Sequence, residues 1–110
     1  GIELDGMGRV KRICYYTNGT MKRIVKEFSG SVMIEYDENG NKVYEGGYSG
    51  DVKSGFVRNE RGYCFSGRIK KYCLYDGGQL IRVMLMFNGS EMTEYDENGK
   101  RRYIGEYSGE

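Results

Sequence analysis

The sequence predicts an all-β fold: an elongated, twisted antiparallel sheet of stacked β-hairpins, forming an open repeat array. Helix formers are scarce, because the 110 residues include no Ala, four Leu and 18 Gly, and Gly weakens a helix interior. Tyr occurs 11 times, and with Ile, Val and Phe it suits a pleated, half-buried surface. The third observation is an internal repeat in which turns and aromatic residues recur in the same order.

The repeat is visible when the chain is compared with itself. Residues 8–50 align without a gap on residues 67–109, and 22 of the 43 pairs are identical. We therefore expect one repeat domain over 1–110, with a first copy at 8–66 and a partial second copy at 67–110. Both ends of the chain fall within a motif, so we expect a fragment of a longer array, in which each unit buries its face only against neighbours.

A finer period comes from aromatic-x-Gly triplets. They begin at Phe28, Tyr44, Phe65, Phe87 and Tyr103, at spacings of 16, 21, 22 and 16 residues. Units of this length fit one hairpin each, so three hairpins are predicted for every 59 residues (16, 21 and 22 together).

Ten strands are expected, and turn signals separate most of them. In chain order they are 9–16, 20–28, 31–36, 41–48, 56–58, 63–65, 67–75, 79–87, 90–95 and 100–107. Asn-Gly or Gly-Gly steps favour reversals at 18–19, 39–40, 77–78 and 98–99, since such steps allow the positive φ angles of tight turns.

Aromatic and glycine positions that recur are expected to form the core. Tyr44, Gly46 and Tyr48 keep their identity in the second copy, whereas the alternating residues Val43, Glu45 and Gly47 change. Period-two recurrence favours packing over an exposed binding face, although tyrosines suit either. The expected core positions are Phe28, Gly30, Tyr44, Gly46, Tyr48, Phe65, Gly67, Phe87, Gly89, Tyr103, Gly105 and Tyr107.

Residues 44–55, YEGGYSGDVKSG, resemble a MORN repeat, and residues 103–107, YIGEY, repeat its opening. The run EYDENG at 35–40 and 94–99 is similar to the linker between divergent MORN copies. The match is divergent, because Gly50 stands one position early and Val57 replaces a later glycine. The resemblance implies an elongated sheet of hairpins that serves in scaffolding, dimerisation or assembly near membranes, without catalytic machinery.

Catalytic and metal sites are not expected. The chain has no His, so the commonest general base and neutral metal ligand are missing. The DENG carboxylates at 37–40 and 96–99 are interpreted as turn caps, and the three cysteines form no CxxC pair. We therefore predict a protein that is not an enzyme, with no cofactor and no small-molecule substrate.

Basic residues recur at equivalent positions and define a possible anion-binding stripe. Its members are Arg9, Lys11, Arg12, Arg23, Arg68, Lys70, Lys71 and Arg82. A solvated face balanced by Glu27, Glu35 and Glu94 is the favoured interpretation, because surface charges usually serve solubility. Anionic lipid is the alternative ligand, and nucleic acid is not favoured.

One strand differs between the copies. Val25-Lys26-Glu27 becomes Met84-Leu85-Met86, so the second copy is apolar on both faces there. Such surfaces mark interaction sites. The possible partner strand comprises Ile81, Val83, Met84, Leu85 and Met86.

The predicted function is a non-catalytic scaffold that binds a protein partner or itself. The alternatives are a peripheral module on anionic lipid and, by analogy with the bacterial MORN-type variant, an antitoxin-like or effector module. An odd cysteine count and the lack of a long apolar run favour an intracellular location, cytoplasmic or close to cytoskeleton or membrane.

Overall fold

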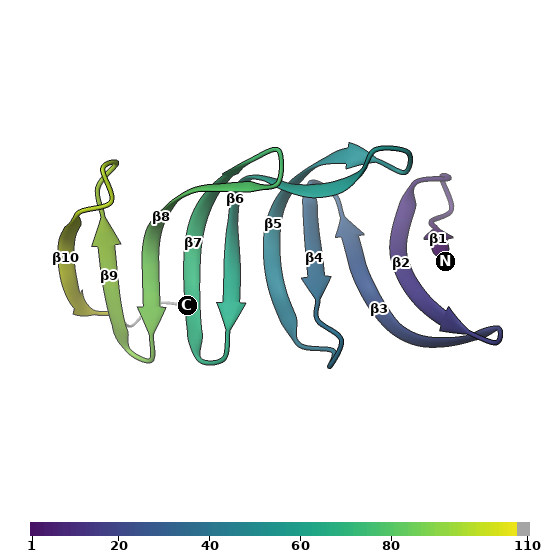
Figure 1. The fold of residues 1–110 in the computed structure, drawn as a ribbon, viewed down its shortest axis with the longest axis horizontal. Coiled ribbons are helices and arrows are strands. Elements are labelled where there is room, and N and C mark those ends of the chain that lie inside the picture. The colour runs from purple at the N-terminus through teal and green to yellow at the C-terminus, as the bar shows by residue number, and fades with distance from the viewer. Residues whose placement is uncertain (108–110) are drawn as a thin grey trace.

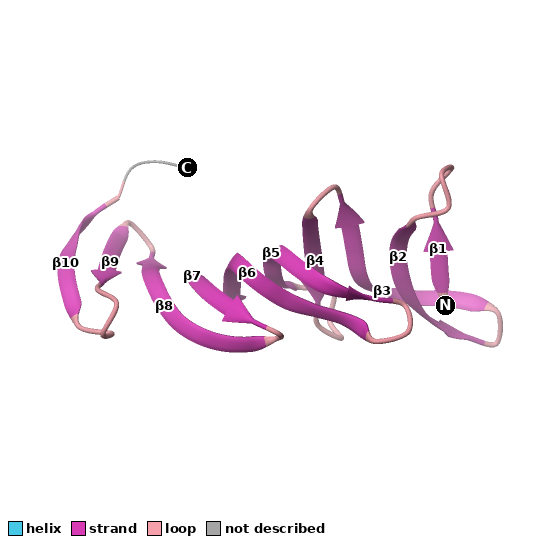
Figure 2. Cartoon of the chain, turned by 90° about the horizontal axis from the view of Figure 1, so that it is seen from above, coloured by secondary structure: helices cyan, strands magenta, loops and turns pink. Residues whose placement is uncertain are grey.

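The computed structural model describes residues 1–107, and in them the chain forms one open antiparallel sheet of ten strands, ordered β1 to β10 (Figure 1). The strands are β1 (Ile2–Leu4), β2 (Val10–Thr17), β3 (Thr20–Ser29), β4 (Val32–Tyr36), β5 (Lys42–Asp51), β6 (Gly55–Ser66), β7 (Ile69–Asp76), β8 (Gln79–Asn88), β9 (Glu91–Tyr95) and β10 (Arg101–Glu106). The sheet is elongated, 49 × 24 × 21 Å, as the view from above also shows (Figure 2). The all-β prediction is confirmed, and the described residues include no helix able to cross a membrane.

The turns explain why successive strands reverse. In the DENG turn, the Asp37 side chain accepts hydrogen bonds from the backbone N–H groups of Asn39 and Asn41, both at 2.9 Å. Gly40 supplies the positive φ of 83° that the turn requires. Asp96 closes the second-copy turn in the same way, at the same distances.

The predicted grouping into three hairpins per 59 residues is wrong. Residues 56–58 and 63–65 belong to a single strand, β6, so the first copy contributes five strands, β2 to β6. Between them, Glu60 has a φ of 65°, and the β5–β6 register shifts, which bends the strand without reversing it. Strand β1, at Ile2–Leu4, was not predicted.

Five strands is an odd number, and this decides how the two copies are related. In an antiparallel sheet, equivalent strands five places apart run in opposite directions, as the arrows of β3 and β8 do in Figure 1. The order of strands along the sheet nevertheless stays the same. Reversing the strand direction while keeping that order turns the unit over, so equivalent side chains project to opposite faces.

The strand pairing follows this rule. Across the strands, partners run Met33–Gly46–Gly62 in the first copy and Met92–Phe87–Lys70–Phe65 in the second. Gly62 and Phe65 lie three residues apart in a regular part of β6, so they face opposite ways. Met33 and Met92 are repeat equivalents, and we name the two surfaces the Met33 face and the Met92 face.

The main core lies on the Met33 face. Met33, Tyr44, Cys73 and Tyr75 form a cluster whose members are at most 5% exposed. The rings of Tyr44 and Tyr75 meet edge to face, with centroids 5.4 Å apart. A free cysteine often acts as a small buried hydrophobe, and Cys73 is a buried free cysteine of this kind.

The expected core positions fall into three groups. Tyr44 and Phe87 are buried, while Phe28, Tyr48, Phe65 and Tyr107 are partly buried. Gly30, Gly67 and Gly89 lie in turns with positive φ, and Gly46 and Gly105 lie under tyrosine hydroxyls. The prediction of a core position is wrong for Tyr103, which is 47% exposed. It lies on β10, an edge strand, and no strand within residues 1–107 covers its outer side.

Candidate protein-binding face

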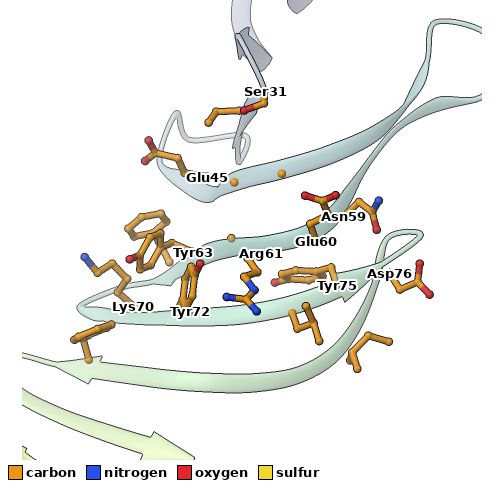
Figure 3. Close-up of a pocket in the computed structure, with 18 of the residues that line it drawn as sticks. Ser31, Glu45, Asn59, Glu60, Arg61, Tyr63, Lys70, Tyr72, Tyr75 and Asp76 are labelled. Atoms are coloured by element: carbon orange, nitrogen blue, oxygen red, sulfur yellow. The ribbon is translucent and has the colours of Figure 1, made fainter. Parts of the chain in front are cut away.

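An aromatic groove of about 1160 Å³ crosses the Met92 face in the middle of the sheet (Figure 3). Tyr63 on β6 and Tyr72 on β7 form a cross-strand pair whose ring centroids are 4.7 Å apart. Figure 3 shows Lys70 and these two tyrosines together at one end of the groove, and Asn59, Glu60 and Asp76 toward the other. The groove therefore has an aromatic, basic end and a polar, acidic end.

Lys70 contacts two of the aromatic rings at this end of the groove. Its Nζ atom lies 4.9 Å from the ring centroid of Tyr63 and 5.2 Å from that of Phe87. Phe87 in turn packs on Tyr107, with centroids 4.7 Å apart. Cation–π contacts of this kind hold a lysine over aromatic rings, so the amine stays at the groove surface.

The first copy covers its corresponding surface with part of its own chain. The far part of the β5–β6 hairpin, which we call the arm (residues 47–60), bends across β3 and β4 in Figure 1. Phe56 of the arm packs on Phe28, with ring centroids 4.5 Å apart, and its carbonyl accepts a 2.5 Å hydrogen bond from Lys26 Nζ. The arm thus occupies the Met33 face of its copy.

Arg58 fixes the arm electrostatically. Its Nε atom lies 3.2 Å from a carboxylate oxygen of Glu35, and the two side chains are only 28% and 18% exposed. The guanidinium also lies 4.8 Å from the ring centroid of Tyr44 and 5.7 Å from that of Tyr75. Burial lowers the pKa of Arg58, but the charge and hydrogen bond of Glu35 outweigh it and leave that pKa raised.

Neighbouring groups in this cluster are held protonated. Burial raises the pKa of the Tyr44 hydroxyl to about 12 and that of the Cys73 thiol to about 11. Burial and a hydrogen bond with the Cys64 thiol raise the pKa of Tyr75 as well. The raised pKa values lie far above neutral pH, so these hydroxyl and thiol groups stay uncharged in the folded protein. We therefore interpret the cluster as part of the packing that anchors the arm.

In the second copy, the corresponding surface is open along the described chain. Phe87 and Tyr107 are the repeat equivalents of Phe28 and Tyr48, and Leu85 is the equivalent of Lys26. A hollow of about 460 Å³, lined by Tyr72, Leu85 and Glu94 among others, lies where the arm would sit, and it adjoins the groove at Tyr72.

Glu94 is the acidic group of this open surface. It is the equivalent of Glu35, but its ion pair is with Arg102 on β10, at 3.3 Å, where the arginine side chain is 64% exposed. A well-exposed pair of this kind contributes little and exchanges readily with other charges. The groove and this hollow together, on β6 to β9, form the candidate binding face.

The possible partner strand lies partly in this face. Val83 packs against the main core, and Ile81 is 53% exposed. Met84 and Leu85 line the hollow beside Glu94. Met86 pairs with Lys71 and Thr93, so it points to the Met33 face. That another chain covers this strand stays a prediction.

The predicted anion-binding residues are not gathered on one face. Lys70 and Lys71 are consecutive in β7 and project to opposite faces. The remaining members have local partners. Arg9, Lys11 and Arg12 form ion pairs with Asp5 or Glu3, Arg23 and Arg82 donate to the carbonyls of Asp37 and Asp96, and Arg68 lies beside Gly89.

Sequence reasoning missed Tyr63, Tyr72 and the arm. Tyr72 has Ile13 as its repeat equivalent, so recurrence does not single it out. A usable signal was the hairpin turn at Gly67–Arg68, because it places Tyr63 directly opposite Tyr72. Comparisons with family models, curated proteins and solved structures find no match to this chain.

Proposed function

We propose that the chain is a non-catalytic structural repeat module that mediates protein–protein assembly. Its ligand binds the β8 and β9 part of the candidate binding face and is an extended segment with an aromatic residue two positions before an arginine. The observation that carries the proposal is the arm, because Phe56 and Arg58 occupy the equivalent surface of the first copy. The resemblance of residues 44–55 to a MORN repeat supports the same role.

The chemistry of the open surface matches that ligand. Phe87 and Tyr107 offer aromatic contacts like those that Phe28 and Tyr48 make with Phe56. Glu94 offers a carboxylate for a guanidinium, as Glu35 does. Because Leu85 replaces Lys26, the ligand loses one hydrogen bond to its backbone and gains an apolar contact.

The test uses a peptide with the arm's sequence, residues 53–60 (KSGFVRNE), titrated into the full chain labelled for NMR. We expect saturable shifts at Leu85, Phe87 and Glu94, and none at Lys26, Phe28 and Glu35, whose surface the arm already covers. Peptides in which the phenylalanine or the arginine is replaced by alanine should bind several-fold more weakly.

A matched pair of chain variants tests the acidic group. Glu94→Gln should weaken peptide binding several-fold. Glu91→Gln should leave it unchanged, since Glu91 lies on the same strand but pairs with Asn88 and points to the other face. Equal binding of all three peptides, or shifts spread over both copies, would exclude this function.

A further inference from the structure

The groove on the Met92 face lies in the middle of the sheet. Its floor is formed by β5, β6 and β7, and each of these strands pairs with a strand of the same chain on both sides. The arm-like ligand proposed above binds the hollow at Leu85 and Glu94. The groove is therefore a second surface, and its own lining decides which ligand it fits.

The aromatic end of the groove offers two tyrosine rings side by side. Tyr63 and Tyr72 are half-buried, so part of each ring faces the groove, and their planes are tilted by 41° at a centroid distance of 4.7 Å. Proline-rich segments dock in grooves lined by aromatic side chains of this kind. Their rings are rigid and apolar, so they pack on aromatic rings with little loss of conformational entropy.

The other end of the groove carries two exposed carboxylates, those of Glu60 and Asp76. None of the ion pairs within residues 1–107 involves either of them. Figure 3 shows both at the end opposite Lys70. Glu60 holds this place with a φ of 65°, which is uncommon for a residue with a side chain. This end therefore complements a basic group of the ligand.

Hydrogen-bond donors lie between the two ends. A polyproline II helix has no internal hydrogen bonds and proline has no N–H, so the backbone of such a ligand offers carbonyl acceptors alone. Figure 3 shows Arg61 between the tyrosine pair and Asp76, and a guanidinium carries five N–H donors. The groove thus supplies donors along the path where this ligand presents acceptors.

We infer that the groove binds a proline-rich segment of a partner protein in the polyproline II conformation. Its prolines pack on Tyr63 and Tyr72, and an arginine or lysine of the segment meets Glu60 and Asp76. The inference shares the proposed role in protein assembly but assigns a second ligand to a different surface.

The length of the groove sets the spacing within this ligand. Tyr72 and Asp76 are four residues apart on β7, which is about 13 Å at about 3.3 Å per residue. A polyproline II helix rises about 3.1 Å per residue. The basic residue should therefore stand about four positions from the prolines that contact the tyrosines.

The probe is a capped peptide of seven prolines with an arginine at each end, so that either chain direction brings one arginine to the acidic end. Titrated into the full chain labelled for NMR, it should give saturable shifts at Tyr63, Tyr72 and Asp76. A second peptide has glutamine in place of both arginines. It should bind about two- to fivefold more weakly at low salt, the range expected for an exposed charge pair.

Glu60→Gln combined with Asp76→Asn should abolish the difference between the two peptides and leave binding of the glutamine peptide unchanged. Glu38→Gln is the control and should keep the difference, since Glu38 is an exposed glutamate that does not line the groove. Tyr63→Ala should weaken both peptides several-fold. If Tyr63→Ala does not fold, the carboxylate variant still decides, because both of its side chains are exposed.

The inference fails if neither peptide binds saturably, if the shifts lie outside the groove, or if both peptides bind the wild type equally. A difference that persists in the Glu60 and Asp76 variant refutes the placement of the basic residue. Cellohexaose is titrated in parallel, and shifts at Tyr63 and Tyr72 from it alone would assign the groove to a glycan instead.

Titrating the arm peptide KSGFVRNE into the same wild-type chain keeps this test separate from the proposed function. The arm peptide should shift Leu85 and Glu94, whereas the proline peptide should shift Tyr63 and Asp76. Binding of the arm peptide alone leaves the proposed function standing and removes the proline-rich ligand. Binding of the proline peptide alone does the opposite.

Discussion

The ring of Tyr44 lies directly over Gly62 on the neighbouring strand. A Cβ atom at position 62 would come within 2.5 Å of the Tyr44 ring carbons, and the same ring passes close to Gly46. Tyr44 is completely buried, and its hydroxyl donates a 2.6 Å hydrogen bond to the carbonyl of Gly47. The tyrosine therefore has no free space into which it can move aside.

Gly62→Ala should destabilise the protein for this reason. Overpacking of a filled core costs roughly 1–3 kcal/mol, and the free energy of unfolding measured in urea should fall by about that amount. Gly6→Ala is the matched control, since no atom lies within 4 Å of its added methyl group, and it should change stability by less than about 0.5 kcal/mol. Equal effects of the two substitutions would contradict the packing argument.

The sequence predicts the sheet better than it predicts how the copies are arranged. Turn glycines and period-two recurrence identify most strands, because both are local properties of the chain. The bend at Glu60 depends on how β5 and β6 shift their register, and no local pattern marks it. If β6 is taken as two strands, the first copy has six strands in place of five. An even number would give the two copies the same orientation, so the prediction hides that Met33 and Met92 project to opposite faces.

The candidate site was partly predictable for a related reason. Tyr44 and Tyr103 are repeat equivalents, yet one is completely buried and the other is 47% exposed. Their difference comes from the number of neighbouring strands, which recurrence does not report. The change from Lys26 to Leu85 is visible in the sequence. The arm, which covers Lys26 but not Leu85, is not visible there.

Glu35 and Glu94 should differ in their effect on stability. Glu35 is 18% exposed and holds Arg58, so Glu35→Gln leaves a largely buried guanidinium without its counter-charge. Breaking a mostly buried ion pair costs on the order of 1–3 kcal/mol. Glu94→Gln loses only an exposed pair with Arg102 and should cost less than about 0.5 kcal/mol.

Urea unfolding of the two variants gives this comparison directly. Salt provides a second readout, because screening weakens exposed pairs more than buried ones. The cost of Glu35→Gln should therefore persist in 1 M NaCl, a concentration at which the Debye length is about 3 Å. Similar costs for both substitutions would mean that the arm is not anchored through Arg58.

Alkaline pH should destabilise the fold. A hydrogen bond to Glu27 raises the pKa of Tyr36 to about 12, and burial raises the pKa of Tyr44 to about 12, against the ordinary tyrosine value of 10.0. Burial raises the pKa of Cys73 to about 11, against 9.0. These groups hold their protons more tightly when folded, so their contribution is complete below about pH 9.

Between about pH 9 and 12 the unfolded chain loses these protons first, and the free energy of unfolding should fall as pH rises. Urea midpoints at pH 8, 10 and 11 measure the fall, and return to pH 8 checks that it is reversible. Tyr36→Phe combined with Tyr44→Phe should make the fall smaller, because phenylalanine has no hydroxyl proton to lose, and Cys73 and Tyr75 should account for the rest. A midpoint that stays constant in the wild type would show that these hydroxyl and thiol groups keep their ordinary pKa values in the folded protein.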